Sequence, residues 1–136
     1  MQIHSISDWE SWAVAHREVL SGVVAIRGEM GSGKTTAVTA WLRALGSDAK
    51  GSSPTFGLCH HYDVPGLGQV RHFDLYRLDD EDEAEAIGIV EDLDSGAPCW
   101  IEWPEKIPNL LPANTTLLDI EVQEDGVRRV TLNTLT

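Results

Sequence analysis

The sequence predicts an α/β fold, and three observations support this prediction. A run of β-branched residues leads into a glycine-rich loop and then into an amphipathic segment, which is the order strand, loop, helix. Alternating apolar and polar residues on both sides of a Pro-Gly pair indicate an antiparallel hairpin. An Asp-Gly pair near the carboxyl end indicates a second hairpin. Because these segments fit within 136 residues, we expect residues 1–136 to form one domain.

The composition is that of a globular protein with a strongly acidic charge balance. Hydrophobic residues make up 42% of the chain, and 22 Asp and Glu against 10 Lys and Arg give a formal charge of -12. Such a chain repels a nucleic-acid backbone, so we do not expect it to bind nucleic acid on its own. Arg128 and Arg129 are the one adjacent basic pair in the sequence. We interpret this pair as part of a solvated hairpin edge.

Location and redox state follow from two features of the sequence. Neither a basic-then-apolar leader nor an apolar run of membrane-spanning length is present in it, so we expect a cytoplasmic protein without membrane contact. Cys59 and Cys99 are far apart and lack the spacing of zinc ligands. We therefore expect reduced core cysteines, with neither a disulfide nor a structural metal.

The amino-terminal segment is predicted to form an amphipathic helix that ends near Gly22. Ser7 and Glu10 have the spacing of a capping box. Trp9 and Trp12 lie on the apolar stripe of this helix, and we expect them in the core.

A buried strand and a second helix flank the glycine-rich loop. The strand is predicted within residues 22–28, which are bounded by glycines. The second helix starts at Lys34 and ends at Gly46, a residue suited to a helix C-terminus. Its predicted apolar face consists of Val38, Trp41, Leu42 and Leu45.

A hairpin and an acidic helix are predicted in the middle of the chain. The sequence from Asp63 to Gly66 has the form of the D-x-x-G switch of GTPases, but an N-K-x-D motif is missing from the sequence, so we interpret Pro65-Gly66 as a turn. His60 and His61 are neighbours on a predicted strand and face opposite sides, so they cannot bind one metal ion together. Residues 78–93 are predicted to form an exposed helix with acidic residues in its first turn.

Three further strands complete the prediction. A short apolar strand at residues 98–103 is stopped by Pro104. Two strands lie around the Asp125-Gly126 turn.

The glycine-rich loop carries the strongest functional signal in the sequence. Gly28, Gly33, Lys34 and Thr35 fit the pattern G-x-x-x-x-G-K-[ST], between a predicted strand and a predicted helix. Gly31 and Gly33 leave room for backbone N–H groups to bind phosphates. Lys34 supplies a charge to the outer phosphates, and the Thr35 hydroxyl can bind Mg²⁺. The predicted nucleotide-binding residues of this loop are Glu29, Met30, Gly31, Ser32, Gly33, Lys34, Thr35 and Thr36.

Two carboxylates are candidates for the metal and for water activation. Asp74 and Glu102 each follow an apolar strand, where a side chain can face the phosphates. Carboxylate oxygens suit Mg²⁺. A surface carboxylate is an equally good interpretation of either acid alone, but the two together behind a phosphate loop favour a functional site.

Four stretches taken together resemble the TsaE (YjeE) family of bacterial ATPases of tRNA threonylcarbamoyladenosine biosynthesis. They are "GEMGSGKTT", "SSPTFGL", "HFDLYRLDD" and "IEWPE", and the similarity extends over residues 22–112. The resemblance implies a P-loop NTPase-like fold with a central mixed sheet between helices, and ATP and Mg²⁺ as cofactors. It also implies TsaB and TsaD as partners, which modify adenosine 37 of tRNAs that read codons beginning with A, so that tRNA is reached only through the complex.

The resemblance also implies roles for single residues. Lys34 holds phosphates, Thr35 and Glu102 hold Mg²⁺, and Asp74 lies beside the γ-phosphate as a water-positioning acid. The implied catalytic residues are Lys34, Asp74 and Glu102. Thr36 is an implied further phosphate contact. Ser53, Pro54 and Thr55 match a switch-like segment that senses the γ-phosphate. Trp103 is the last implied contact, although it can equally be a core residue. The amino-terminal helix lacks the threonine and glycine expected near adenine, so contacts to the base are not assigned.

Three functions are compatible with the sequence. The first is an ATPase that is weak alone and activated in its complex. The second is a small-molecule kinase, which needs an arginine-rich lid over the phosphates. The third is a nucleotide-gated interaction module without significant turnover.

Overall fold

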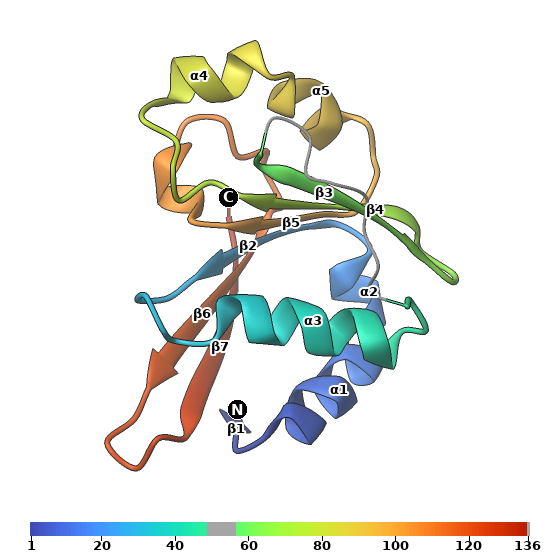
Figure 1. Ribbon diagram of the computed structural model, residues 1–136, viewed down its shortest axis with the longest axis vertical. Coiled ribbons are helices and arrows are strands. Elements are labelled where there is room, and N and C mark those ends of the chain that lie inside the picture. The colour runs from blue at the N-terminus through green and yellow to red at the C-terminus, as the bar shows by residue number, and fades with distance from the viewer. Residues whose placement is uncertain (49–56, 136) are drawn as a thin grey trace.

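The computed structural model describes residues 1–48 and 57–135 (Figure 1). The helices are α1 (Ile6–Ala15), α2 (Arg17–Leu20), α3 (Lys34–Ala44), α4 (Glu81–Ala86) and α5 (Ile89–Asp94), with a 3₁₀ turn at Pro104–Lys106. The strands are β1 (Gln2–Ile3), β2 (Val23–Arg27), β3 (Cys59–Val64), β4 (Gly68–Asp74), β5 (Cys99–Glu102), β6 (Thr116–Val122) and β7 (Arg128–Thr134).

All seven described strands form one mixed sheet, in the order β1-β7-β6-β2-β5-β4-β3. The centre is parallel, since β2 pairs in parallel with β5 and β6, and β5 pairs in parallel with β4. The β3–β4 and β6–β7 pairs are antiparallel hairpins. The α/β fold with a central mixed sheet and antiparallel hairpins is confirmed.

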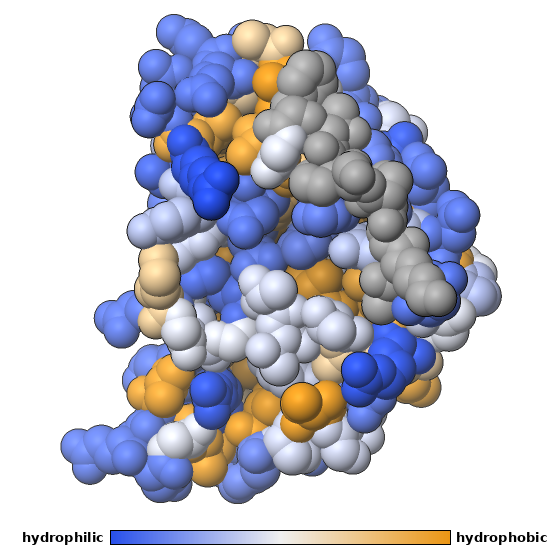
Figure 2. All heavy atoms as spheres, in the orientation of Figure 1, coloured by the Kyte–Doolittle hydropathy of each residue, from blue (hydrophilic) through white to orange (hydrophobic). Residues whose placement is uncertain are grey.

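Helices cover both faces of the sheet (Figure 1). On one face, α1 and α3 bury an apolar cluster against Val24, Ile26 and Trp100. On the other face, α4 and α5 pack over Phe73 and Ile101. Because neighbouring residues of a strand point to opposite faces, Trp100 and Ile101 belong to different clusters. Hydrophilic residues gather over the outer side of α4 (Figure 2).

Four tryptophans form the centre of the α1–α3 face. The ring of Trp41 lies 5.7 Å from that of Trp9, 5.2 Å from Trp12 and 5.5 Å from Trp100. Trp9 and Trp12 are each 3% exposed, which confirms the prediction that they are core residues. Aromatic contacts of this kind add about 0.5 to 1.5 kcal/mol each beyond burial, so α1 is firmly held against α3.

Three predictions about the helices are wrong: one N-cap and the continuity of two helices. The N-cap of α1 is Ser5 and not Ser7: Ser5 has extended backbone, and its side chain accepts a hydrogen bond from the Asp8 N–H. The amino-terminal helix is also interrupted at His16, which separates α1 from α2. The acidic segment forms two short helices and not one, because Gly88 between them takes a left-handed conformation with φ of 85°.

Both cysteines are free and buried, as predicted. Burial raises the pKa of the Cys59 and Cys99 thiols to about 12. In the described residues, no helix has the length and apolar character needed to cross a bilayer.

Candidate functional site

The glycine-rich loop joins the end of β2 to the start of α3. Gly31 and Gly33 have φ angles of 82° and 103°, a left-handed region that residues with a Cβ rarely adopt. Gly28 needs its small size for another reason, because a Cβ there would lie 2.5 Å from the Ser32 hydroxyl oxygen. The loop therefore has the open backbone and the helix N-terminus that bind phosphates.

Lys34 lies at the start of α3 and is held inside this loop. Its ammonium donates hydrogen bonds to the carbonyl oxygens of Gly28 and Glu29 and lies 3.9 Å from the centre of the Trp103 ring. Burial lowers the pKa of Lys34, while the charges of Glu102, Glu105 and Asp74 oppose this shift. The charge is thus placed at the loop before any anion binds.

Glu102 ends β5 and is almost completely buried, with 2% of its surface exposed. One carboxylate oxygen, Oε1, accepts a hydrogen bond from the Thr35 hydroxyl at 2.9 Å. The other, Oε2, lies 2.6 Å from Nε2 of His72. Since a carboxylate oxygen accepts, this bond requires a proton on His72 Nε2. The carboxylate is therefore fixed in orientation from both sides.

His72 is a site residue that was not predicted from the sequence. It lies on β4, buried to 6% exposure, and its Nδ1 has no hydrogen-bond partner in the described part of the chain. Strand alternation contained a signal, because residue 72 is two positions before Asp74 and so faces the same side of the sheet. The contact with Glu102 itself depends on the pairing of β4 with β5.

Asp74 ends β4 directly opposite Glu102 in the parallel register. It is half-buried, and its Oδ1 accepts a hydrogen bond from the Tyr76 backbone N–H at 3.2 Å. Trp103, the residue after β5, has a left-handed conformation with φ of 60° and packs its ring 5.1 Å from that of Tyr76. Trp103 is half-buried, so it contacts both the core and the loop lysine.

Lys34, Asp74, Glu102 and Trp103 line one cleft of about 450 Å³. The predicted site residues that it brings together are Met30, Gly31, Gly33, Lys34, Thr35, Thr36, Asp74, Glu102 and Trp103. Glu29 and Ser32 lie on the far side of the loop, where they line a separate cavity with Arg27 and Asp119. A smaller cavity of about 190 Å³ adjoins the cleft at Gly33, Thr36 and Arg128 and extends to Ile3 and Trp9.

The oxygen donors in the cleft suit Mg²⁺. The Thr35 hydroxyl and the Glu102 carboxylate are 2.9 Å apart at the loop. Mg²⁺ commonly takes one or two protein oxygens and fills its remaining positions with water and substrate phosphates. Within residues 1–48 and 57–135, no cluster of three His, Cys, Asp or Glu side chains forms a metal site by itself.

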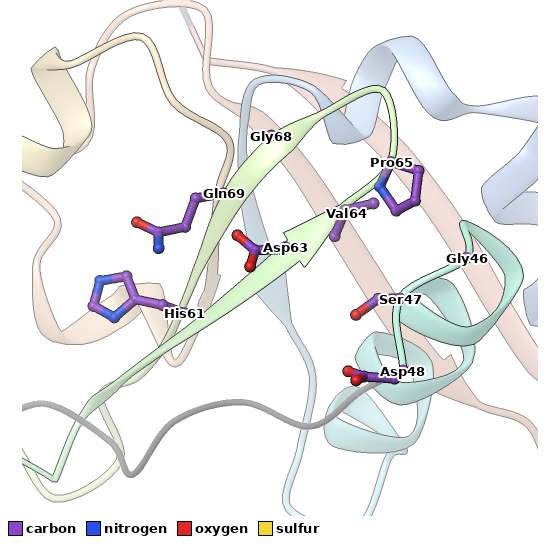
Figure 3. Close-up of a pocket in the computed structure, with 9 residues that line it drawn as sticks. All are labelled: Gly46, Ser47, Asp48, His61, Asp63, Val64, Pro65, Gly68 and Gln69. Atoms are coloured by element: carbon purple, nitrogen blue, oxygen red, sulfur yellow. The ribbon is translucent and has the colours of Figure 1, made fainter.

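A wider depression of about 700 Å³ lies between the end of α3 and the β3–β4 hairpin (Figure 3). Asp48, His61 and Asp63 are among its lining residues. Its two carboxylates disfavour phosphate binding, and it contains no part of the glycine-rich loop. We therefore place the functional site at the loop, although this depression is larger.

Residues 4–130 match the family described as threonylcarbamoyl adenosine biosynthesis protein TsaE. The chain belongs to the TsaE family. It is 32% identical over 130 residues to the tRNA threonylcarbamoyladenosine biosynthesis protein TsaE of Treponema pallidum. The aligned segment covers 94% of this chain and 95% of that protein. It is 37% identical over 104 residues to the Haemophilus influenzae protein of the same name. This aligned segment covers 76% of this chain and 65% of the relative.

The fold agrees with a solved structure. The crystal structure titled "Crystal structure of Bacillus subtilus YdiB" matches with a TM-score of 0.75 and 20% identity, over 100% of this chain and 84% of that one. At this identity the match shows the fold alone. The resemblance to TsaE that the four motifs indicated is confirmed at the level of the family.

The TsaE segment that contains Ser53 and Thr55 lies outside the described residues, so the predicted switch-like role of these two residues stays a prediction. Asp74, Lys34 and Glu102, which come from three other motifs of the resemblance, do lie together.

The interpretation of Arg128 as part of a solvated edge is wrong. Arg128 begins β7, is half-buried, and donates from Nε to the Ser32 carbonyl oxygen at 3.3 Å. Arg129, by contrast, is exposed and pairs with Glu121 at 3.2 Å, as expected for a hairpin edge. The two residues differ because successive side chains of a strand point to opposite faces.

Proposed function

We propose that this TsaE-family chain binds ATP with Mg²⁺ and hydrolyses it, as one P-loop ATPase domain over residues 1–136. The observation that supports this most strongly is the convergence of Lys34, Thr35 and Glu102 in one cleft at the glycine-rich loop. A phosphate chain needs the positive charge and the N–H groups, and its metal needs the two oxygen donors.

Each residue of the cleft has a distinct part in the proposed reaction. The Lys34 ammonium exchanges its carbonyl partners for phosphate oxygens, where it stabilises the charge that develops in phosphoryl transfer. Thr35 and Glu102 hold Mg²⁺, which supplies charge neutralisation at the phosphates when it is bound. Asp74, beside Glu102 and still accessible to solvent, orients the attacking water. His72 keeps the Glu102 carboxylate aligned.

The smaller cavity beside the cleft is the proposed site of the adenine base. It meets the phosphate cleft at Thr36 and is lined by the buried Ile3 and Trp9 and by Ile6, which is 50% exposed and offers apolar surface. A cavity with some apolar lining next to a charged cleft suits a nucleotide, which has an aromatic base at one end and anionic phosphates at the other.

We further propose that the chain acts with TsaB and TsaD proteins in making threonylcarbamoyladenosine in tRNA, and that it is a weak ATPase until it joins them. Phosphoryl transfer often gains its speed from an arginine that a partner delivers to the γ-phosphate. The formal charge of -12 favours docking onto a basic partner surface and disfavours direct contact with tRNA. Docking should then weaken as salt rises.

ATP turnover by the purified chain tests this proposal. We expect slow hydrolysis by the chain alone and faster hydrolysis after both partners are added. Lys34→Ala should abolish hydrolysis under both conditions. Rapid turnover by the chain alone, unchanged by the partners, would contradict the gated ATPase and favour a kinase. Nucleotide binding without turnover under every condition would favour an interaction module.

A further inference from the structure

Arg128 reaches from the carboxyl-terminal hairpin to the glycine-rich loop, 96 positions away from its partner Ser32 in the chain. Its Nε donates to the Ser32 carbonyl oxygen at 3.3 Å, and its Nη1 donates to the Gly126 carbonyl oxygen at 2.8 Å. Figure 1 shows the loop between β2 and α3 beside the β6–β7 hairpin. Two contacts, one on each segment, thus fix the guanidinium over the loop.

In the part of the chain that the structure describes, no carboxylate pairs with the charge of Arg128. Three other arginines, Arg27, Arg71 and Arg129, form ion pairs with Asp119, Asp92 and Glu121. Among residues 1–48 and 57–135, no carboxylate lies within ion-pair distance of Arg128, whose hydrogen bonds go to neutral carbonyl oxygens. A guanidinium in this state retains donors and a full charge for an anionic ligand.

Arg128 also lies where the two cavities of the site meet. It lines the phosphate cleft with Lys34 and Glu102, and it lines the smaller cavity with Trp9. The cavities share Gly33, Thr36 and Arg128. A nucleotide that places its outer phosphates at Lys34 and its base beside Trp9 must pass its α-phosphate through this junction.

We propose that Arg128 binds the α-phosphate of the nucleotide, and so contributes to affinity for mono-, di- and triphosphates alike. This inference rests on the proposed nucleotide-binding function. Hydrogen bonds from arginine to phosphate are charge-assisted and stronger than those between neutral groups. Because the same side chain holds the Ser32 carbonyl, it also keeps the β6–β7 hairpin against the loop.

The test measures how tightly adenosine, AMP, ADP and ATP bind, by competition with a fluorescent ADP derivative, without Mg²⁺. The variants are Arg128→Gln, Arg128→Lys and the matched control Arg129→Gln, which changes the neighbouring arginine on the exposed side of the strand. We expect Arg128→Gln to weaken AMP, ADP and ATP by a similar factor, roughly 10- to 100-fold. The affinity of Arg128→Gln for adenosine should stay unchanged. The control Arg129→Gln should bind all four ligands as the unaltered chain does.

Arg128→Lys keeps the charge and loses the planar fork, so we expect an intermediate loss of affinity. Circular dichroism would show whether Arg128→Gln unfolds. If it does, the test uses Arg128→Lys, in which the affinities for AMP, ADP and ATP are compared with the affinity for adenosine. A loss confined to ATP would place Arg128 at the γ-phosphate, and an equal loss for adenosine would make it a brace for the loop; either result overturns the proposal. If the unaltered chain binds none of these ligands, the proposed function itself fails, whereas unaltered binding by the variants defeats the Arg128 assignment alone.

Discussion

Replacing His72 by Leu removes one of the two hydrogen bonds that hold the Glu102 carboxylate. The other partner, Thr35, binds the other carboxylate oxygen, Oε1. Glu102 Oε2 would therefore remain buried without its partner. Leaving a buried acceptor unsatisfied costs about 1 to 3 kcal/mol. We therefore expect His72→Leu to lower the free energy of unfolding by about 1 to 3 kcal/mol.

The same change should weaken Mg²⁺ binding, because a metal ligand that loses its supporting hydrogen bond is less well oriented. Losses of about 10- to 100-fold are typical for such supporting partners. His72→Gln retains an N–H donor and should recover part of both properties. His60→Leu is a matched control, because His60 is the cross-strand partner of His72 and stacks on its ring at 5.9 Å without contacting Glu102.

The assays are urea unfolding of the chain without ligands and titration of Mg²⁺ against ATP-loaded protein. Equal values for His72→Leu and His60→Leu, in both the free energy of unfolding and the apparent Mg²⁺ affinity, would refute the proposed role of His72. A loss of stability with unchanged Mg²⁺ affinity would show that His72 supports the fold and does not orient the ligand.

Two further predictions follow from pKa shifts. Burial lowers the pKa of Lys34 below its ordinary value of 10.5 in the free protein, and bound phosphates would raise it again. Nucleotide binding then takes up a proton above the lowered pKa. ATP affinity should therefore fall as the pH rises through this lowered pKa toward 10.5, and Lys34→Arg, which stays charged, should flatten this profile. Burial raises the pKa of Cys59 and Cys99 to about 12, so the native thiols should resist iodoacetamide at mildly alkaline pH, while the urea-unfolded chain should react at both positions. Rapid alkylation of the folded chain would contradict the buried placement of the thiols.

The local parts of the site could be predicted from the sequence, because the residues involved are neighbours in the chain. The strand, loop and helix around Lys34 are set by glycines and β-branched residues within about twenty positions. Asp74 and Glu102 could be predicted as strand-end acids, since each follows an apolar run. Their direct pairing comes from the parallel register of β4 and β5.

The parts that could not be predicted depend on contacts between distant segments. His72 meets Glu102 only after β4 and β5 pair, and Arg128 meets Ser32 only after the hairpin folds back to the loop. The misplaced N-cap has a local cause, because Ser5 and Ser7 are both good capping residues. Ser5 is the cap because β1 ends at Ile3, and the helix can begin as soon as the chain leaves the strand.

The most direct test of the central claim is single-turnover ATP hydrolysis with Mg²⁺ by three proteins: the unaltered chain, Glu102→Gln and the control Glu85→Gln. Glu85 lies on α4 and is exposed. The substitution at Glu102 keeps the side-chain shape and removes the charge that Mg²⁺ needs, so hydrolysis with TsaB and TsaD present should fall about 100-fold or more, while ATP binding changes less than about tenfold. Glu85→Gln should behave like the unaltered chain. Hydrolysis by Glu102→Gln at the unaltered rate would contradict the assignment of this cleft as a magnesium-ATP site.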